Sequence, residues 1–249
     1  MNGSPTQGMV SRLPLYGLGL AVLTVFAMVL AALGSRWGWW HFRVGFTILE
    51  WSVYGGLTVG FIALTGLSIA AWKHDWPGLL LGGVGLVISI LAVGIPWNWL
   101  QTAKGVPPIH DITTDTENPP QFVAILPLRK DAPNPAEYGG PEVAVRQRAG
   151  YPDLGPATLP FSPEIAFQRA LLAAREMGWE IEDANSAEGR IEATDTTFWF
   201  GFKDDIVVRI TLVEAGSRID VRSVSRVGKS DVGTNAKRIR KFLQTLNHL

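Results

Sequence analysis

Three long runs without a charged residue occupy the first hundred positions, and they constrain the fold of this chain more than any other feature. They extend over Leu15–Ser35, Trp51–Trp72 and Trp76–Ala103. Because an α-helix rises about 1.5 Å per residue, roughly 20 residues span the hydrocarbon core of a bilayer. The runs therefore predict three transmembrane helices, near residues 14–34, 48–71 and 78–99.

Tryptophan marks the ends of these runs, which supports the same interpretation. Indole rings favour the headgroup layer, where an apolar ring and an N–H donor are both accommodated. A buried helical hairpin in a soluble protein is the alternative, but three such long runs with aromatic ends are hard to bury. Of the ten tryptophans, eight precede residue 100: Trp37, Trp39, Trp40, Trp51, Trp72, Trp76, Trp97 and Trp99.

The first run also has features of a cleaved signal peptide. Arg12 provides a basic start, and Ala32-Leu33-Gly34 resembles a cleavage site. The apolar stretch is longer than the usual 7–15 residues of a signal peptide, which favours a retained helix.

Small residues four positions apart occur in the second and third runs, at Gly56 and Gly60 and at Gly78 and Gly82. Such spacing lets helix backbones approach closely in lipid. Packing inside a three-helix bundle and a homo-oligomer seam are both compatible with it.

The charged residues are concentrated after residue 108, so residues 1–104 form a membrane region and residues 105–249 a separate soluble domain. The formal net charge is zero, so no global field favours nucleic acid. The chain has no cysteine, which excludes disulfides and thiolate chemistry.

Membrane orientation is weakly determined by charge. With the N-terminus in the cytoplasm, Arg12 and Lys73 lie inside, whereas Arg36, Arg43 and Lys104 lie outside. Because lysine and arginine favour the cytoplasmic side, this count mildly favours the opposite topology.

The soluble half predicts an α+β fold, with four or five antiparallel strands and helices on one sheet face. Ser162 and Pro163 are typical of a helix start, and Gly178 of its end. The last helix carries an apolar stripe that includes Ile239 and Phe242. Further expected elements are a short helix at 141–149 and strands at 122–126, 179–183, 190–194, 206–212 and 218–226.

An irregularity and a turn are expected after the strand at 190–194. The parity of Ile191 and Ala193 differs from that of Phe198, Phe200 and Phe202, which predicts a bulge or break near 195–197 before an alternating segment. Lys203-Asp204 is then interpreted as a hairpin turn.

Several segments of this half resemble one known family. The quoted segments are Ile109–Asp115, Asn118–Pro120, Tyr151–Asp153, Asp195–Phe198, Phe202–Asp205 and Arg222–Asp231, with Gly233, Asn235 and Arg238. They resemble the bacterial and plastid family called domain of unknown function 1499, over most of residues 106–246. The resemblance implies no activity. It implies an exported or lumenal setting, and hence a periplasmic domain on a bacterial inner membrane. This placement is opposite to the one that the count of lysine and arginine in the loops mildly favours.

His110, Asp111 and Asp115 form the first candidate site. An imidazole and carboxylates can hold a divalent cation. Their spacing matches no standard metal motif, and the alternative is that the Asp and Thr side chains of 111–115 bond backbone groups and pin an extended segment to the sheet.

The second candidate is a basic, hydroxyl-rich run before the last helix, where helix N–H groups and arginines can bind an anion. Period two places Arg222 and Arg226 on one face, opposite Ser223 and Ser225. The alternative pairs these arginines with aspartates on neighbouring strands. The candidate ligand-binding residues are Arg222, Ser223, Ser225, Arg226, Lys229 and Asn235.

These observations favour a membrane-anchored envelope protein that is not an enzyme, whose soluble domain binds an envelope lipid, another anionic ligand or a protein. No cofactor is expected. The alternative is a membrane-anchored enzyme that uses His110 and the nearby aspartates, with or without a metal. A transporter is disfavoured because the helices carry almost no polar group apart from Glu50.

Overall fold

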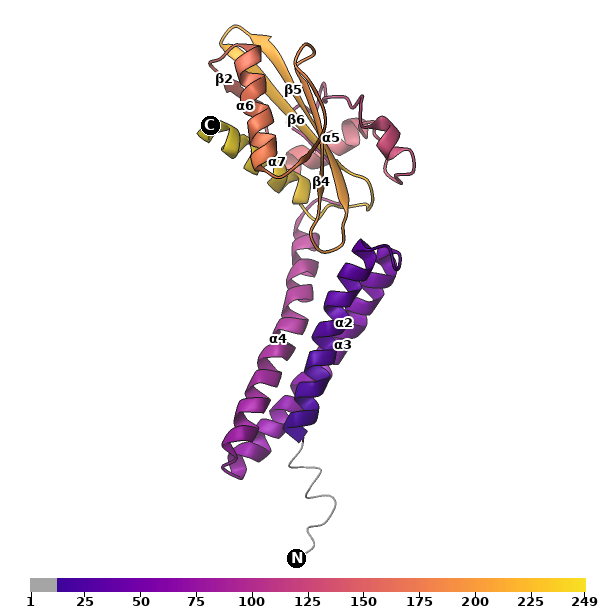
Figure 1. The fold of residues 1–249 in the computed structure, drawn as a ribbon, viewed down its shortest axis with the longest axis vertical. Coiled ribbons are helices and arrows are strands. Elements are labelled where there is room, and N and C mark those ends of the chain that lie inside the picture. The colour runs from indigo at the N-terminus through magenta and orange to yellow at the C-terminus, as the bar shows by residue number, and fades with distance from the viewer. Residues whose placement is uncertain (1–12) are drawn as a thin grey trace, which may run out of the picture. The chain divides into compact units, whose positions relative to one another are not determined.

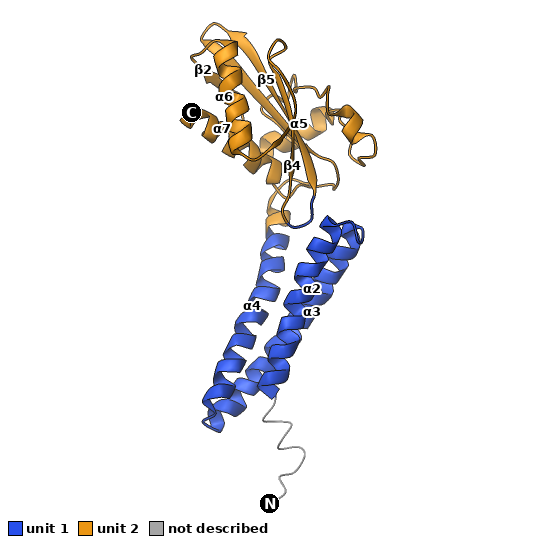
Figure 2. Ribbon diagram, in the orientation of Figure 1, with its two compact units in different colours: residues 1–101, 199–201 blue, residues 102–198, 202–249 orange. Residues whose placement is uncertain are grey.

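The computed structural model describes residues 13–249, which divide into two compact units. One consists of residues 13–101 with 199–201, and the other of residues 102–198 with 202–249 (Figure 2). Each has its own packing, and each is described separately.

The first unit contains three helices that are long and apolar enough to cross a membrane. They are α2 (Leu13–Arg36), α3 (Phe42–Trp72) and α4 (Trp76–Gly105), and each starts before and ends after the span expected from the sequence. The predicted membrane anchor is therefore present as three apolar helices.

The spaced glycines lie at contacts between α3 and α4. A Cβ added at Gly60 would lie 2.5 Å from the Ser89 hydroxyl, and one added at Gly82 would lie 2.8 Å from Leu67. The Ser89 hydroxyl donates to the Gly56 carbonyl at 2.7 Å. Packing within the bundle thus accounts for these small residues, since a larger side chain would push the helices apart.

The second unit is a six-stranded antiparallel sheet with helices (Figure 1). The main order is β1-β6-β5-β4-β3, and β2 pairs with the same edge of β6 as β1, nearer the other end. The strands are β1 (Asp111–Thr113), β2 (Ala157–Leu159), β3 (Glu180–Asn185), β4 (Arg190–Thr196), β5 (Lys203–Val213) and β6 (Gly216–Ser225).

Three helices belong to this unit: α5 (Gly140–Gly150), α6 (Pro163–Glu176) and α7 (Thr234–His248). The last two pack on one sheet face, where residues such as Phe167, Ile206 and Phe242 form the main core. Alternation along the strands brings apolar side chains to this face. The predicted α+β fold with helices on one face is confirmed.

The opposite face is covered by residues 115–139, which we call the strap. The strap contains only one turn of 3₁₀ helix, η1 (Leu126–Arg129). A small apolar cluster that includes Phe122, Ile125 and Val207 lies beneath it. The expected strand at 122–126 was wrong, because the N–H groups of 123–125 bond a side-chain carboxylate instead of a neighbouring strand.

The expected turn at Lys203-Asp204 was also wrong. β4 ends at Thr196, the chain turns through 197–202, and β5 starts at Lys203. The Thr197 N–H donates to the Phe202 carbonyl at 2.8 Å, and Gly201 has a φ of +68°, which suits glycine. The alternating aromatic residues therefore belong to a loop and not to a strand.

Candidate functional site

The sheet face beneath the strap is unusually rich in charge. Residues of alternate parity on β4, β5 and β6 point to it, among them Glu192, Asp205, Asp220 and Arg222, all of which are buried. Burying an ionised group costs several kcal/mol unless it is paired and hydrogen-bonded. The partners of these groups therefore decide whether any of them is free for chemistry.

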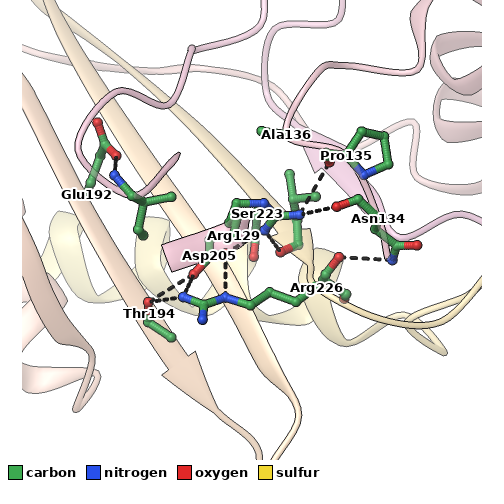
Figure 3. Close-up of polar contacts among 12 residues, drawn as sticks. Arg129, Asn134, Pro135, Ala136, Glu192, Thr194, Asp205, Ser223 and Arg226 are labelled. Atoms are coloured by element: carbon green, nitrogen blue, oxygen red, sulfur yellow. Dashed lines mark hydrogen bonds and ion pairs between the residues drawn. The ribbon is translucent and has the colours of Figure 1, made fainter. Parts of the chain in front are cut away.

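Asp205 is the centre of one network (Figure 3). Its carboxylate accepts hydrogen bonds from Arg129 of the strap at 2.5 Å and from Arg226 at 2.7 and 2.9 Å. The Thr194 hydroxyl also donates to it, at 2.9 Å. Two guanidinium groups thus neutralise one fully buried carboxylate, and one of them ties the strap to the sheet.

Glu192 ties the strap at a second point. Its carboxylate accepts the backbone N–H groups of Val123, Ala124 and Ile125 at 2.8–3.1 Å, and it pairs with Arg190. One side chain thus satisfies three consecutive backbone donors, of which that of Ile125 is buried.

Arg222 holds both ends of the strap. Its guanidinium donates to the Asp111 carboxylate at 2.8 and 3.0 Å, and to the carbonyls of Pro120 and Ala136. Burial raises the pKa of Asp111, against the lowering effect of Arg222. Asp111 and Arg222 therefore form a buried, bidentate ion pair, and Arg222 is not available to an external ligand.

Asp115 belongs to another cluster, with Asp220, Arg209 and Arg218. Both arginines donate to each carboxylate at about 3.0 Å. Burial raises the pKa of Asp115, but the backbone N–H groups of Asn118 and Glu117, with the arginines, outweigh it and leave the pKa lowered. This aspartate is therefore held as an anion by fixed donors.

The opposite parity of β6 forms a polar cluster with α7. The Ser223 hydroxyl donates to the Asn235 side-chain oxygen at 2.7 Å, and the Asn235 amide donates to the Ser225 hydroxyl at 3.0 Å. Arg238 donates to Ser223, and it pairs with Asp204 at 2.6 Å and with Asp195 at 2.8 Å. Because neither serine bonds a general base, neither hydroxyl is activated as a nucleophile.

The residues predicted to bind an anion are mostly engaged in these networks. The expected parity is confirmed, because Arg222 and Arg226 lie under the strap while Ser223 and Ser225 face α7. Arg226 pairs with Asp205, as the alternative interpretation expected, whereas Arg222 pairs with Asp111 of β1. Of the six candidates, only Lys229 is exposed.

The residues predicted to bind a metal are not brought together. Asp111 and Asp115 each bond arginines. Across residues 13–249 there is no group of three or more His, Asp or Glu side chains arranged to hold a metal ion. The alternative interpretation describes this segment better: Thr114 donates its N–H to the Val221 carbonyl and accepts the Val221 N–H, which pins the chain to β6.

A pocket of about 350 Å³ opens beside β1. Its lining includes the cationic residues Arg146 and Lys229, the acidic residue Glu137, the paired Asp111, and His110. Its walls comprise the start of β1, the end of the strap, one face of α5 and the loop after β6. The complete lining is Pro108, Ile109, His110, Asp111, Asn134, Pro135, Glu137, Gly139, Val143, Arg146 and Lys229.

Asn134 joins two of these walls (Figure 3). Its side-chain amide donates to the carbonyls of Ser225 and Gly228, and its N–H donates to the Arg226 carbonyl. The loop that carries Lys229 is thereby bonded to the strap. The main chain of His110 is fixed in the same way, because its carbonyl accepts from the Ser225 N–H and the Asn235 amide.

Helix α5 presents its first turn to the pocket. Gly139, Val143 and Arg146 line it, and they lie on one helical face. Gly139 is the N-cap and has no side chain that could accept the free N–H groups of the first turn. A helix N-terminus carries a partial positive charge, which the carboxylate of Glu142 in the same turn partly offsets.

A family model described as "Protein of unknown function (DUF1499)" matches residues 111–246. The chain belongs to this family. The DUF1499 region contains the whole sheet, the strap and nearly all of α7, and therefore every ion pair described above, while the three apolar helices lie outside it. No curated protein matches the chain. No solved structure matches it.

Sequence reasoning missed several residues of the DUF1499 domain that define the pocket and strap. Arg129 and Glu137 lie in the proline-rich segment that shows no periodicity, and Arg146 lies on a helix with little amphipathic pattern. Only their positions after folding relate them to His110 and Lys229. A charged residue inside an irregular segment, such as Arg129 between two prolines, is the one signal in the sequence that would have suggested an attachment of the strap to the sheet.

Proposed function

We propose that this protein is a multi-pass protein of the bacterial inner membrane whose DUF1499 domain, on the periplasmic side, binds an anionic ligand and catalyses no reaction. The pocket beside β1 is the proposed site. The observation that carries the proposal is its combination of Arg146, Lys229 and the uncapped first turn of α5 around one cavity.

The two cations at the pocket differ from the buried arginines of the networks described above, because no buried carboxylate holds them. Lys229 is exposed and forms no ion pair with the described part of the chain. Arg146 has only a 4.0 Å contact with Glu142, and both side chains are more than half exposed. Such exposed pairs contribute little energy, so a ligand anion can replace Glu142 at low cost.

The domain around the pocket is built as a rigid support. The charged groups in the networks of Asp205, Glu192 and Arg222 are already paired with one another, so they are not free to act on a substrate. The enzyme alternative relied on His110 with nearby aspartates, and arginines hold both Asp111 and Asp115. A preorganised pocket with few free polar groups suits recognition of a ligand.

Binding can be tested on the full-length protein in a nonionic detergent. We expect inorganic phosphate or glycerol 3-phosphate to raise its melting temperature, and Lys229→Ala with Arg146→Ala to abolish the shift. Lys241→Ala is the matched control, because Lys241 is an exposed lysine on α7 outside the pocket. Equal shifts in the wild type and the double variant, or no shift with either anion, would contradict the proposal.

The periplasmic placement requires a separate measurement. We expect alkaline phosphatase fused after Leu249 to be active and green fluorescent protein at the same position to stay dark, because only the former folds actively in the periplasm. The reverse result would place the domain in the cytoplasm, in line with the count of basic residues.

A further inference from the structure

We infer that the ligand of the pocket is an anionic glycerophospholipid from the bilayer in which the three helices lie. This inference rests on the proposed function and narrows it from anions in general to a lipid headgroup. Three features of the described residues lead to it: the reach of the chain, the apolar part of the lining, and the arrangement of charges.

The chain that joins the last apolar helix to the pocket is short. α4 ends at Gly105, and Pro108, the first residue of the pocket lining, follows three residues later. Three residues span at most about 11 Å. Trp97 and Trp99, with exposed rings, lie about two turns before the end of α4, as residues of the headgroup layer do. The pocket lining is therefore joined to the last apolar helix by only a short link of chain.

The lining combines charge with apolar surface. Pro108, Pro135 and Val143 contribute hydrocarbon groups beside the cations. A free phosphate would leave this surface in contact with water, whereas the glycerol backbone and first methylenes of a lipid would cover it. The volume of about 350 Å³ is at the small end of ligand pockets, so it suits a headgroup and not whole acyl chains.

The charges place the phosphate and leave room for hydroxyl groups. Arg146 and Lys229 line the same cavity as the first turn of α5, where a phosphate is favoured. The exposed carboxylate of Glu137 accepts hydroxyl hydrogen bonds, as a glycerol headgroup would donate them. Glu137, the acidic lining residue that forms no ion pair with the described residues, also distinguishes the pocket from a simple basic patch.

Native mass spectrometry of the full-length protein in nonionic detergent would test the inference. The probes are dihexanoyl-phosphatidylglycerol, dihexanoyl-phosphatidylcholine and glycerol 3-phosphate. We expect the phosphatidylglycerol to bind at least ten times more tightly than either of the others. Lys229→Gln, in an exposed loop position, should weaken this binding at least fivefold, while Lys241→Gln leaves it unchanged.

The apolar wall is tested by Val143→Thr, which conserves the shape of the side chain. It should weaken phosphatidylglycerol binding and leave glycerol 3-phosphate binding unchanged. Equal affinity for glycerol 3-phosphate and phosphatidylglycerol would overturn the lipid inference and leave the anion site standing. Equal affinity for both lipids would also overturn it, and absence of binding by all three probes would contradict the proposed function as well.

Discussion

Arg222 shows how single residues hold this domain together. Among the residues that the structure describes, it is the largest fully buried side chain, and its partners come from β1 and from both ends of the strap. The rings of Phe122 and Tyr138 lie 5.2 and 5.5 Å from the guanidinium carbon. A cation in this position links three segments that are distant in the sequence, which an apolar residue would do with less directional specificity.

Removing one member of the Asp111–Arg222 ion pair should strongly destabilise the domain. We expect Asp111→Asn and Arg222→Met each to lower the free energy of unfolding by about 3 kcal/mol, since each leaves a buried charge without its partner. The double variant Asp111→Asn/Arg222→Met should lose clearly less than the sum. Urea unfolding of the four proteins measures this, and additive losses would show that the pair is not coupled.

The lowered pKa of Asp115 leads to a prediction about how stability depends on pH. Its pKa in the folded protein is lowered, so its contribution to stability is present above the unfolded value of 3.8 and is lost as the pH falls through the folded value. Asp115→Asn retains the oxygen that caps the N–H groups of Glu117 and Asn118, but it loses the charge facing Arg209 and Arg218.

We therefore expect the wild type to exceed Asp115→Asn in stability by about 1 kcal/mol at pH 6, with the difference closing below pH 3.8. Urea midpoints from pH 3 to pH 7 would show it. A difference that is constant across this range would mean that the carboxylate charge is not responsible.

At the scale of elements, the strap is the distinctive part of this domain. It has almost no regular structure, yet Glu192, Asp205 and Arg222 hold it at three separate places on the sheet. Several of its backbone groups, at 120, 123–125 and 136, bond side chains of the sheet and not a neighbouring strand. Order in this segment therefore depends on a few buried charges.

Glu192→Gln tests this dependence. The neutral amide offers one acceptor oxygen to three N–H groups and no longer neutralises Arg190, so we expect a loss of about 2 kcal/mol. Hydrogen exchange should accelerate first at 123–125, while β5 and β6 retain their protection. Uniform acceleration across the domain would show instead that strap and sheet unfold as one unit.

At the scale of the whole molecule, the chain joins a helical unit whose surface is apolar to a domain whose charges are mostly paired internally. Many large apolar side chains of the helices are exposed, for example Phe61 at 73% and Leu80 at 70%. In water such a surface would drive association, whereas acyl chains cover it.

We accordingly expect the full-length protein to remain in the membrane pellet after extraction with alkaline carbonate, and to be released by nonionic detergent. Removing residues 1–101 should abolish pelleting of the chain. Release of the full-length protein by carbonate alone would show that the helices do not cross the bilayer.

The sequence by itself determined the type of secondary structure that most segments form. Uncharged runs with tryptophan ends specified the three helices, and alternation in 206–212 and 218–226 specified β5 and β6, because these patterns are local. It failed where local patterns mislead, at Phe122–Leu126 and Phe198–Phe202, whose apolar, β-branched or aromatic residues are typical of strands.

Only the tertiary structure decided which charges meet. Asp111 and Arg222, or Arg129 and Asp205, are separated by many residues and pair because β1 and the strap close on β5 and β6. The same closure buried most of the predicted anion site and brought Arg146 to the cavity that Lys229 lines. A periodic pattern predicts which face of a strand or helix a residue occupies. Which residue it pairs with depends on the segments that folding brings against that face.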